Sequence, residues 1–148
     1  MNTRMDRIGA GGLVITVAVA IAMVVHLNGQ VSQVSGDFRN AVTAEVRDAQ
    51  GAVLLRGTFA AVGGDSDSEV ERQATLASTE AGATATGDAE VEYEKDQPHV
   101  QEVEFNVTGV PARAVLTLVL DGTTVLSATA NDKGEAEAEV QVSVAPRP

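Results

Sequence analysis

The chain contains no cysteine and no tryptophan. Without cysteine it can form no disulfide, thiol nucleophile or thiolate metal site, and it has no residue that could accept a lipid after a leader segment. It has only three phenylalanines and one tyrosine. Aromatic platforms that stack on sugars or bases are therefore nearly absent, and any core must consist largely of Val, Leu and Ala.

Basic residues are also scarce. The 10 Lys and Arg residues are outnumbered by 21 Asp and Glu residues, which gives a formal net charge of -11. Nucleic-acid backbones and anionic lipid surfaces attract clusters of Lys and Arg. A field of the opposite sign argues against nucleic acid as a partner, and against docking on lipid through a basic patch.

Histidine is the third scarce residue, with only His26 and His99 present. A serine nucleophile needs a base that is held by a third group, and a catalytic zinc usually needs three protein ligands. His99, beside Pro98 in an expected turn, meets neither requirement, and the chain has no GxxxxGK[ST] or GxGxxG phosphate loop. We therefore expect no enzyme activity, no small-molecule substrate and no cofactor apart from the calcium considered below.

One long apolar run is present, near the N-terminus. It extends over 18 uncharged residues from Ile8 to Val25 and follows Arg4 and Arg7. As a helix it would be about 27 Å long, near the thickness of a bilayer core, and the arginines indicate a cytoplasmic N-terminus. A signal peptide cleaved near Gly36, which would give a secreted protein, is the alternative. The expected organisation is a cytoplasmic segment 1–7, a transmembrane signal anchor 8–27, a stalk 28–38 and an extracytoplasmic β-domain 39–146.

Beyond residue 38, apolar residues recur at every second position, which is the period of a half-buried strand. In DAEVEYEK, for example, Ala89, Val91 and Tyr93 alternate with glutamates. The dipeptide Asp121-Gly122 separates two β-rich segments and suits the positive φ angles of a type I′ hairpin turn. Short connections predict antiparallel pairing. The expected strands lie within residues 40–48, 52–60, 69–79, 88–95, 100–109, 115–120, 123–130 and 135–144.

This pattern predicts an all-β domain of about eight strands. We expect a single antiparallel β-sandwich, because the two longer loops would let strands cross between sheets, with a small up-and-down barrel as the alternative.

The segment from Val103 to about residue 140 contains three turn motifs in a characteristic order. These are Gly-Val-Pro at residues 109–111, the Asp-Gly hairpin at 121–122, and the glycine-ending turn NDKG at 131–134. In this order the segment resembles secreted bacterial β-modules of the CHRD-like kind. The resemblance implies an extracytoplasmic all-β module and supplies no catalytic residues.

A candidate calcium site lies in the expected loop DSDSE. It places Asp65, Asp67 and Glu69 at alternate positions, and carboxylates are calcium ligands. The loop is not an EF-hand, because Val70 and Leu76 occupy the positions where that motif has Gly and Glu. A calcium site of another kind is one hypothesis, and a solvated acidic loop is the simpler interpretation.

Glutamates also recur at every second position in three expected strands. Side chains two apart in a strand share a face but are separated by about 6.6–7 Å, too far to close on one cation. If the three strands adjoin, the glutamates form one acidic face that is either solvated or binds cations. These glutamate ladders are Glu90, Glu92 and Glu94; Glu102 and Glu104; and Glu135, Glu137 and Glu139.

The sequence therefore predicts a non-enzymatic, membrane-anchored extracytoplasmic β-domain. Its expected role is that of a structural or protein-interaction module of the cell envelope. A divalent-cation-binding module that uses the acidic loop or the glutamate ladders is the alternative.

Overall fold

The computed structural model describes residues 34–62, 68–79, 84–97 and 99–144. The expected cytoplasmic segment 1–7 and signal anchor 8–27 lie outside the described residues, as do most of the stalk and the acidic loop positions Asp65 and Asp67. Among the described residues, no helix is long and apolar enough to cross a membrane.

Every described element is a β-strand, and all pairings are antiparallel, as predicted. Each of the expected strand segments overlaps a strand, although β5 begins two residues before its expected segment, and β3 is an addition that sequence reasoning missed. The strands are β1 (Thr43–Arg47), β2 (Val53–Thr58), β3 (Ala60–Val62), β4 (Glu69–Ser78), β5 (Thr86–Glu94), β6 (Val100–Thr108), β7 (Val115–Leu120), β8 (Thr123–Thr129) and β9 (Glu135–Ser143).

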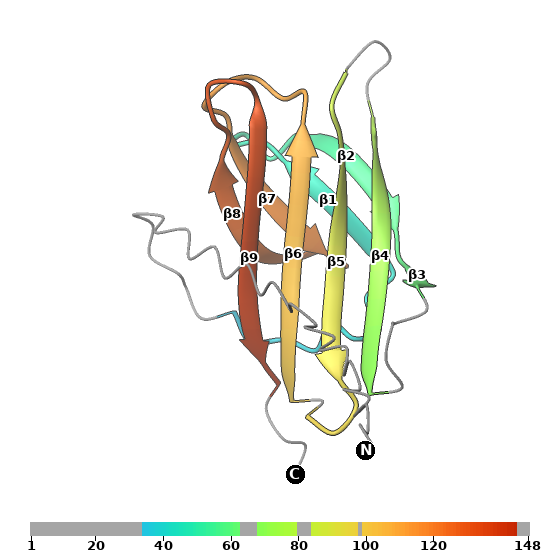
Figure 1. Cartoon of the computed structure of the whole chain (residues 1–148). Helices are drawn as coiled ribbons and strands as arrows, with labels where there is room; N and C mark the ends of the chain where they lie inside the picture. The colour runs from blue at the N-terminus through green and yellow to red at the C-terminus, as the bar shows by residue number, and fades with distance from the viewer. Residues whose placement is uncertain (1–33, 63–67, 80–83, 98, 145–148) are drawn as a thin grey trace, which may run out of the picture.

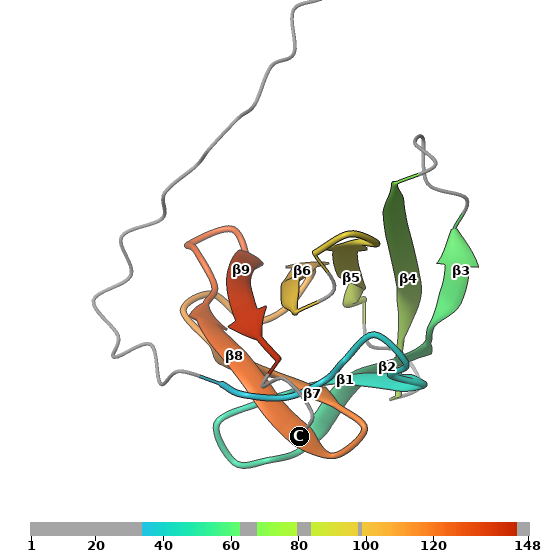
Figure 2. The ribbon, with the colours of Figure 1, turned by 90° about the horizontal axis from the view of Figure 1, so that it is seen from below.

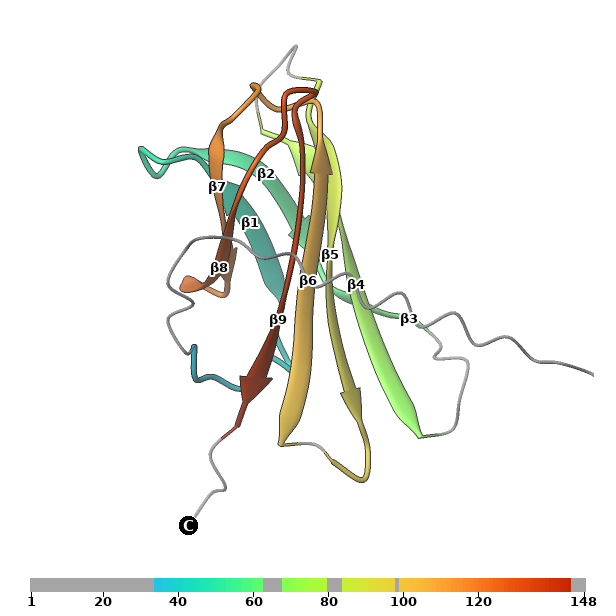
Figure 3. The same ribbon diagram turned by 60° about the vertical axis from the view of Figure 1, so that its left-hand side comes forward.

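The strands form one sheet in the order β8-β7-β1-β2-β4-β5-β6-β9, with β3 paired to β4. The sheet curls so that β4, β5, β6 and β9 face β8, β7, β1 and β2, as Figures 1 and 3 show. The outermost strands β8 and β9 pack against each other without pairing, so the sheet nearly closes into a barrel (Figure 2).

This result refines the predicted sandwich. Two facing layers are present, but they are continuous through the pairing of β2 with β4 and do not form separate sheets. The order is also not that of an up-and-down barrel, because β1 lies between β2 and β7, and β9 lies beside β6. These neighbours are distant in sequence, and turn signals alone do not reveal them.

The core lies between the two layers and follows the predicted alternation. Phe105 in β6 and Leu118 in the opposite layer are both fully buried. Val42 is an exception to the alternation, since it is in phase with the buried Ala44 and Val46 but is 56% exposed. It precedes β1, and its N–H is held by the carboxylate of Asp121 at 3.0 Å.

The predicted type I′ hairpin turn is confirmed. Asp121 and Gly122 have φ angles of 45° and 83° and connect β7 directly to β8. At the NDKG turn, Gly134 has a φ of 76°, and a Cβ there would lie 2.1 Å from the carbonyl oxygen of Val110. Only glycine therefore allows this turn to pack on the β6–β7 connection.

Residues 36–41, which we call the strap, cross the lower end of the sheet (Figure 2). Phe38 is buried in the core, so the packed domain includes the last residue of the expected stalk. The Phe38 N–H donates to the side-chain oxygen of Gln101 at 2.7 Å, and Gln101 Nε2 donates to the Gly36 carbonyl at 3.1 Å. Arg72 Nη1 donates to the carbonyls of Arg39 and Ala41 at 3.0 and 2.7 Å.

Candidate functional site: an acidic sheet face

The outward side chains of β4, β5, β6 and β9 form one surface, which we call the acidic face. Because these strands are consecutive neighbours in the sheet, the three glutamate ladders lie side by side, and β4 extends the surface further. Its carboxylates are Glu69 and Glu71 of β4; Asp88, Glu90, Glu92 and Glu94 of β5; Glu102 and Glu104 of β6; and Glu135, Glu137 and Glu139 of β9.

Carboxylates lie directly opposite one another across these strands. Glu90 pairs with Glu104, which pairs in turn with Glu139. In the next row, Glu92 pairs with Glu102. Neighbouring strands are about 4.8 Å apart, so these groups are closer than glutamates within one strand. Like charges in such pairs destabilise a sheet.

No Lys or Arg lies opposite any of these carboxylates in the paired residues of β3, β4, β5, β6 and β9. Asn106 is one of the neutral partners, and its Nδ2 donates to Glu104 at 2.8 Å. The negative charge of the acidic face is therefore not balanced across the strands. The non-acidic partners are Gln73, Thr75, Asn106, Thr108 and Gln141, with Val62 of β3 at the edge.

This crowding changes the protonation of the glutamates. A hydrogen bond shared with Glu69, followed by burial, raises the pKa of Glu92 to about 8. Burial, followed by repulsion from neighbours that include Glu71 and Glu104, raises the pKa of Glu90 to about 7. Burial and the nearby Glu139 also raise the pKa of Glu102. The acidic face therefore holds protons at neutral pH and is less negative than its formal charge.

A pocket of about 150 Å³ lies on the acidic face where β5 ends and β6 begins. It is smaller than the roughly 300–1,000 Å³ of most small-molecule sites. It has room for several water molecules or for a small cation such as an ammonium or guanidinium group. Its polar lining is formed by Glu92, Tyr93, Glu94, Gln97, Glu102 and Gln141.

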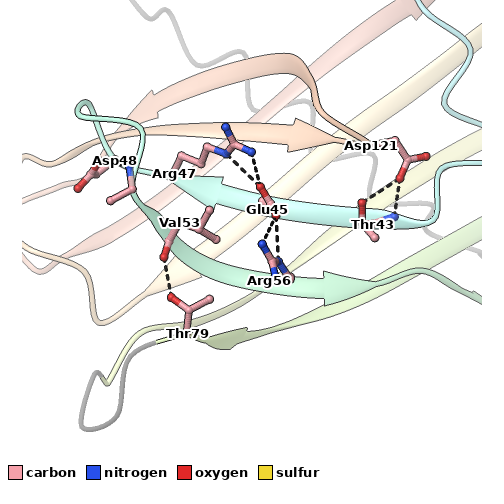
Figure 4. A network of polar contacts seen from close by, with 9 residues as sticks. Thr43, Glu45, Arg47, Asp48, Val53, Arg56, Thr79 and Asp121 are labelled. Carbon is pink, nitrogen blue, oxygen red and sulfur yellow. Dashed lines mark hydrogen bonds and ion pairs between the residues drawn. The ribbon is translucent and has the colours of Figure 1, made fainter.

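The opposite layer, formed by β8, β7, β1 and β2, differs because the outward carboxylate of its β1 strand lies beside two arginines; we call it the balanced layer. On its outward side, Glu45 accepts hydrogen bonds from Arg47 Nη2 and Arg56 Nη2, each at 2.5 Å (Figure 4). The hydrogen bond from Arg47, helped by Arg56, lowers the pKa of Glu45 below its ordinary value. This carboxylate is ionised and partnered, and it offers no unbalanced charge.

The carboxylate of Asp121 accepts hydrogen bonds from the residue at the start of β1 (Figure 4). Its Oδ1 accepts hydrogen bonds from the Thr43 N–H at 2.8 Å and from the Thr43 hydroxyl at 2.9 Å. Burial alone would raise the pKa of Asp121, but the donors of Thr43 and Val42 outweigh it and lower the pKa. This aspartate therefore has a structural role.

The structure describes only one of the three residues of the expected calcium loop. Glu69 begins β4 and shares a hydrogen bond with Glu92 on the acidic face, whereas Asp65 and Asp67 lie outside the described residues. Within the described ranges, no three His, Asp or Glu side chains converge as metal ligands. Calcium binding stays a prediction.

His99 lies in a turn, as expected, and its carbonyl accepts the Val144 N–H at 2.8 Å.

Sequence reasoning missed Gln101 and Arg72, although a signal was present. Gln101 is in phase with the buried Val103 and Phe105, and Arg72 is in phase with Ala74. A polar residue on the apolar side of a strand must find a partner, because an unpaired buried polar group costs free energy. Both residues find theirs in the strap.

Comparison with known proteins gives no relative from which a role could be transferred: no family model matches this chain, and no curated protein or solved structure is significantly similar to it.

Proposed function

We propose that this chain is a non-enzymatic, extracytoplasmic β-domain of the cell envelope, anchored by residues 8–27, whose acidic face binds a basic protein partner. One observation carries this proposal. Carboxylates from four adjacent strands share a surface on which no Lys or Arg lies opposite them in the paired strands. A positively charged partner would relieve their repulsion, and charge complementarity would also speed the encounter and select against acidic proteins.

The spacing of the acidic face suggests the form of the partner. Within each strand the carboxylates repeat at about 6.6–7 Å, because successive outward residues are two positions apart. An extended segment with Lys or Arg at alternate positions has the same repeat. Such a segment could lie along β5 and β6 with each cation near two carboxylates, for example Glu90 and Glu104.

Binding of a defined basic peptide tests the interaction. The probe is a labelled peptide of alternating Lys and Ser, added to the full-length protein in neutral detergent micelles and followed by fluorescence anisotropy. We expect salt-sensitive binding that weakens at least about threefold in Glu104→Gln, since one unit of charge is removed from the centre of the face. Asp132→Asn is the matched control, because Asp132 lies in the β8–β9 turn, outside the paired strands, and pairs with Arg113. Equal affinities for the two variants would contradict the proposal.

The proposed location has its own test. A C-terminal tag on the full-length chain should be digested by protease added to intact spheroplasts, and the chain should be found in the membrane fraction. A variant without residues 1–29 should leave that fraction. A tag that is protected until the cells are lysed would show that the domain faces the cytoplasm.

A further inference from the structure

Two consecutive residues of β6 connect the strap to the acidic face. Gln101 points inward, is fully buried, and holds both Phe38 and Gly36 through its side-chain amide. Glu102 points outward into the acidic face, opposite Glu92 of β5. A movement of the β6 backbone at this point therefore affects both features.

Strands β5 and β4 show the same arrangement as β6, in which a residue that contacts the strap is adjacent to an outward-facing glutamate. In β5, Tyr93 lies between two outward glutamates, and the Arg39 guanidinium of the strap is 6.0 Å from its ring centre. In β4, Arg72 donates to two strap carbonyls and directly follows the outward Glu71. The strap thus rests on the inner side of the strand ends whose outer side carries the crowded carboxylates.

The charged groups around Glu102 are nearly all acidic. Glu92 and Glu90 face it from β5, Glu104 adjoins it on β6, and Glu139 shares a hydrogen bond with it from β9. Gln141 of β9 adds a neutral partner. One row further out are Glu71 on β4 and Glu94 on β5, and the described part of the β5–β6 connection adds Lys95, Asp96 and His99.

We propose that the strap is a pH-sensitive latch: protons on the acidic face keep β6 packed so that Gln101 holds the strap, and their loss at higher pH releases it. Ionisation of Glu102 and Glu90 places like charges on adjacent strands, and the strands can relieve this repulsion by separating at this end. The latch goes beyond partner binding and does not depend on it.

The direction of the effect follows from the protonation equilibria. The pKa of Glu90 is raised from 4.5 to about 7, and that of Glu102 is raised in the same direction. The folded form therefore binds more protons than the unfolded form above about pH 4.5. The stabilisation is full below that pH and is lost as the pH rises through about 7.

Hydrogen exchange of the Phe38 amide tests the latch, since this N–H donates to Gln101. The full-length protein in neutral detergent micelles is followed by NMR at pH 5, 6, 7 and 8, with correction for intrinsic exchange rates. We expect the protection factor of this amide to fall by about tenfold between pH 5 and pH 8, the equivalent of one pKa unit. In Glu102→Gln the fall should be much smaller, because position 102 can no longer ionise.

Two comparisons keep the test specific. Glu137→Gln removes the same charge from β9 opposite Asn106, away from the strap, and should keep the wild-type pH dependence. The Phe105 amide, in the same strand, should stay protected while that of Phe38 exchanges. If Glu102→Gln does not fold, Glu90→Gln serves in its place. Protection of Phe38 that is independent of pH, or that falls equally at Phe105, would overturn the latch.

Discussion

Glu45 and Glu90 are both outward-facing glutamates in the middle of a strand, yet they lie in opposite layers and behave in opposite ways. The residue directly across from Glu45 is Arg56, and the residue across from Glu90 is Glu104. The pKa of Glu45 is lowered, chiefly by Arg47, whereas that of Glu90 is raised to about 7, chiefly by burial. Strand pairing therefore helps to decide which carboxylates of this chain carry charge at neutral pH.

Deleting core side chains should produce the largest effects and tests whether the two layers unfold together. Phe105 is in β6, in the layer that carries the acidic face, and Leu118 is in β7 of the opposite layer. Both side chains are fully buried. We expect Phe105→Ala to cost about 3–5 kcal/mol and Leu118→Ala about 2–5 kcal/mol. Because the layers are one sheet, urea denaturation should show a single transition in each variant. A second transition in either variant would show that the layers unfold separately.

Removing the Asp121 carboxylate should have the next largest effect, and it is confined to the balanced layer. Asp121→Ala loses the hydrogen bonds to Val42 and Thr43 and puts alanine at a positive φ angle. We expect a loss of about 1–2 kcal/mol in the free energy of unfolding. Asp121→Asn keeps one acceptor oxygen and tolerates this backbone conformation, so its loss should be smaller. Equal losses in thermal denaturation would contradict the assigned hydrogen bonds.

Neutralising one glutamate in each layer should change stability in opposite directions. At pH 7, Glu45→Gln removes an ion pair with two arginines and should destabilise by about 0.5–1 kcal/mol. Glu104→Gln removes a charge opposite Glu90 and Glu139 and should stabilise by a similar amount. The Glu45→Gln loss should be full above pH 4.5 and should shrink as the pH falls through the lowered pKa of Glu45, because the carboxylate of the folded protein is protonated only there. Urea midpoints at pH 4 and 7 check both signs.

Salt should have the smallest effect. Raising the ionic strength from about 0.01 to 0.15 M shortens the Debye length from about 30 to about 8 Å. At pH 8 this should stabilise the protein by a few tenths of a kcal/mol, because repulsion on the acidic face is screened. The same change should reduce the loss caused by Glu45→Gln. If salt destabilised the wild-type protein, attraction in the balanced layer would dominate.

Local signals predicted much of this fold correctly. The Asp121-Gly122 turn and the alternation through Val103 and Phe105 depend on residues close in sequence, and both were recognised. The glutamate ladders were recognised for the same reason, since their period matches that of a strand. The short strand β3 was missed because Ala60–Val62 is brief and runs directly into the glycines of an expected loop.

Strand order could not be predicted in this way. β9 joins β6 across the whole β7–β8 hairpin, and this pairing is what places Glu104 opposite Glu139. The acidic face therefore depends on contacts between distant segments, which no local pattern encodes. The hydrogen bonds that Asp121 accepts from Thr43 were missed for the same reason, since Thr43 lies far from it in the sequence.

The way the strap is held also has a mechanical consequence. Tension on the chain before residue 34 would reach β6 through the two hydrogen bonds of Gln101 before it loads the pairing of β1. If those bonds and the contacts of Arg72 gave way first, residues 36–41 would straighten toward their full span of roughly 20 Å and lengthen the chain by part of that distance. The domain would then lengthen under tension by releasing the strap, while every strand stays paired.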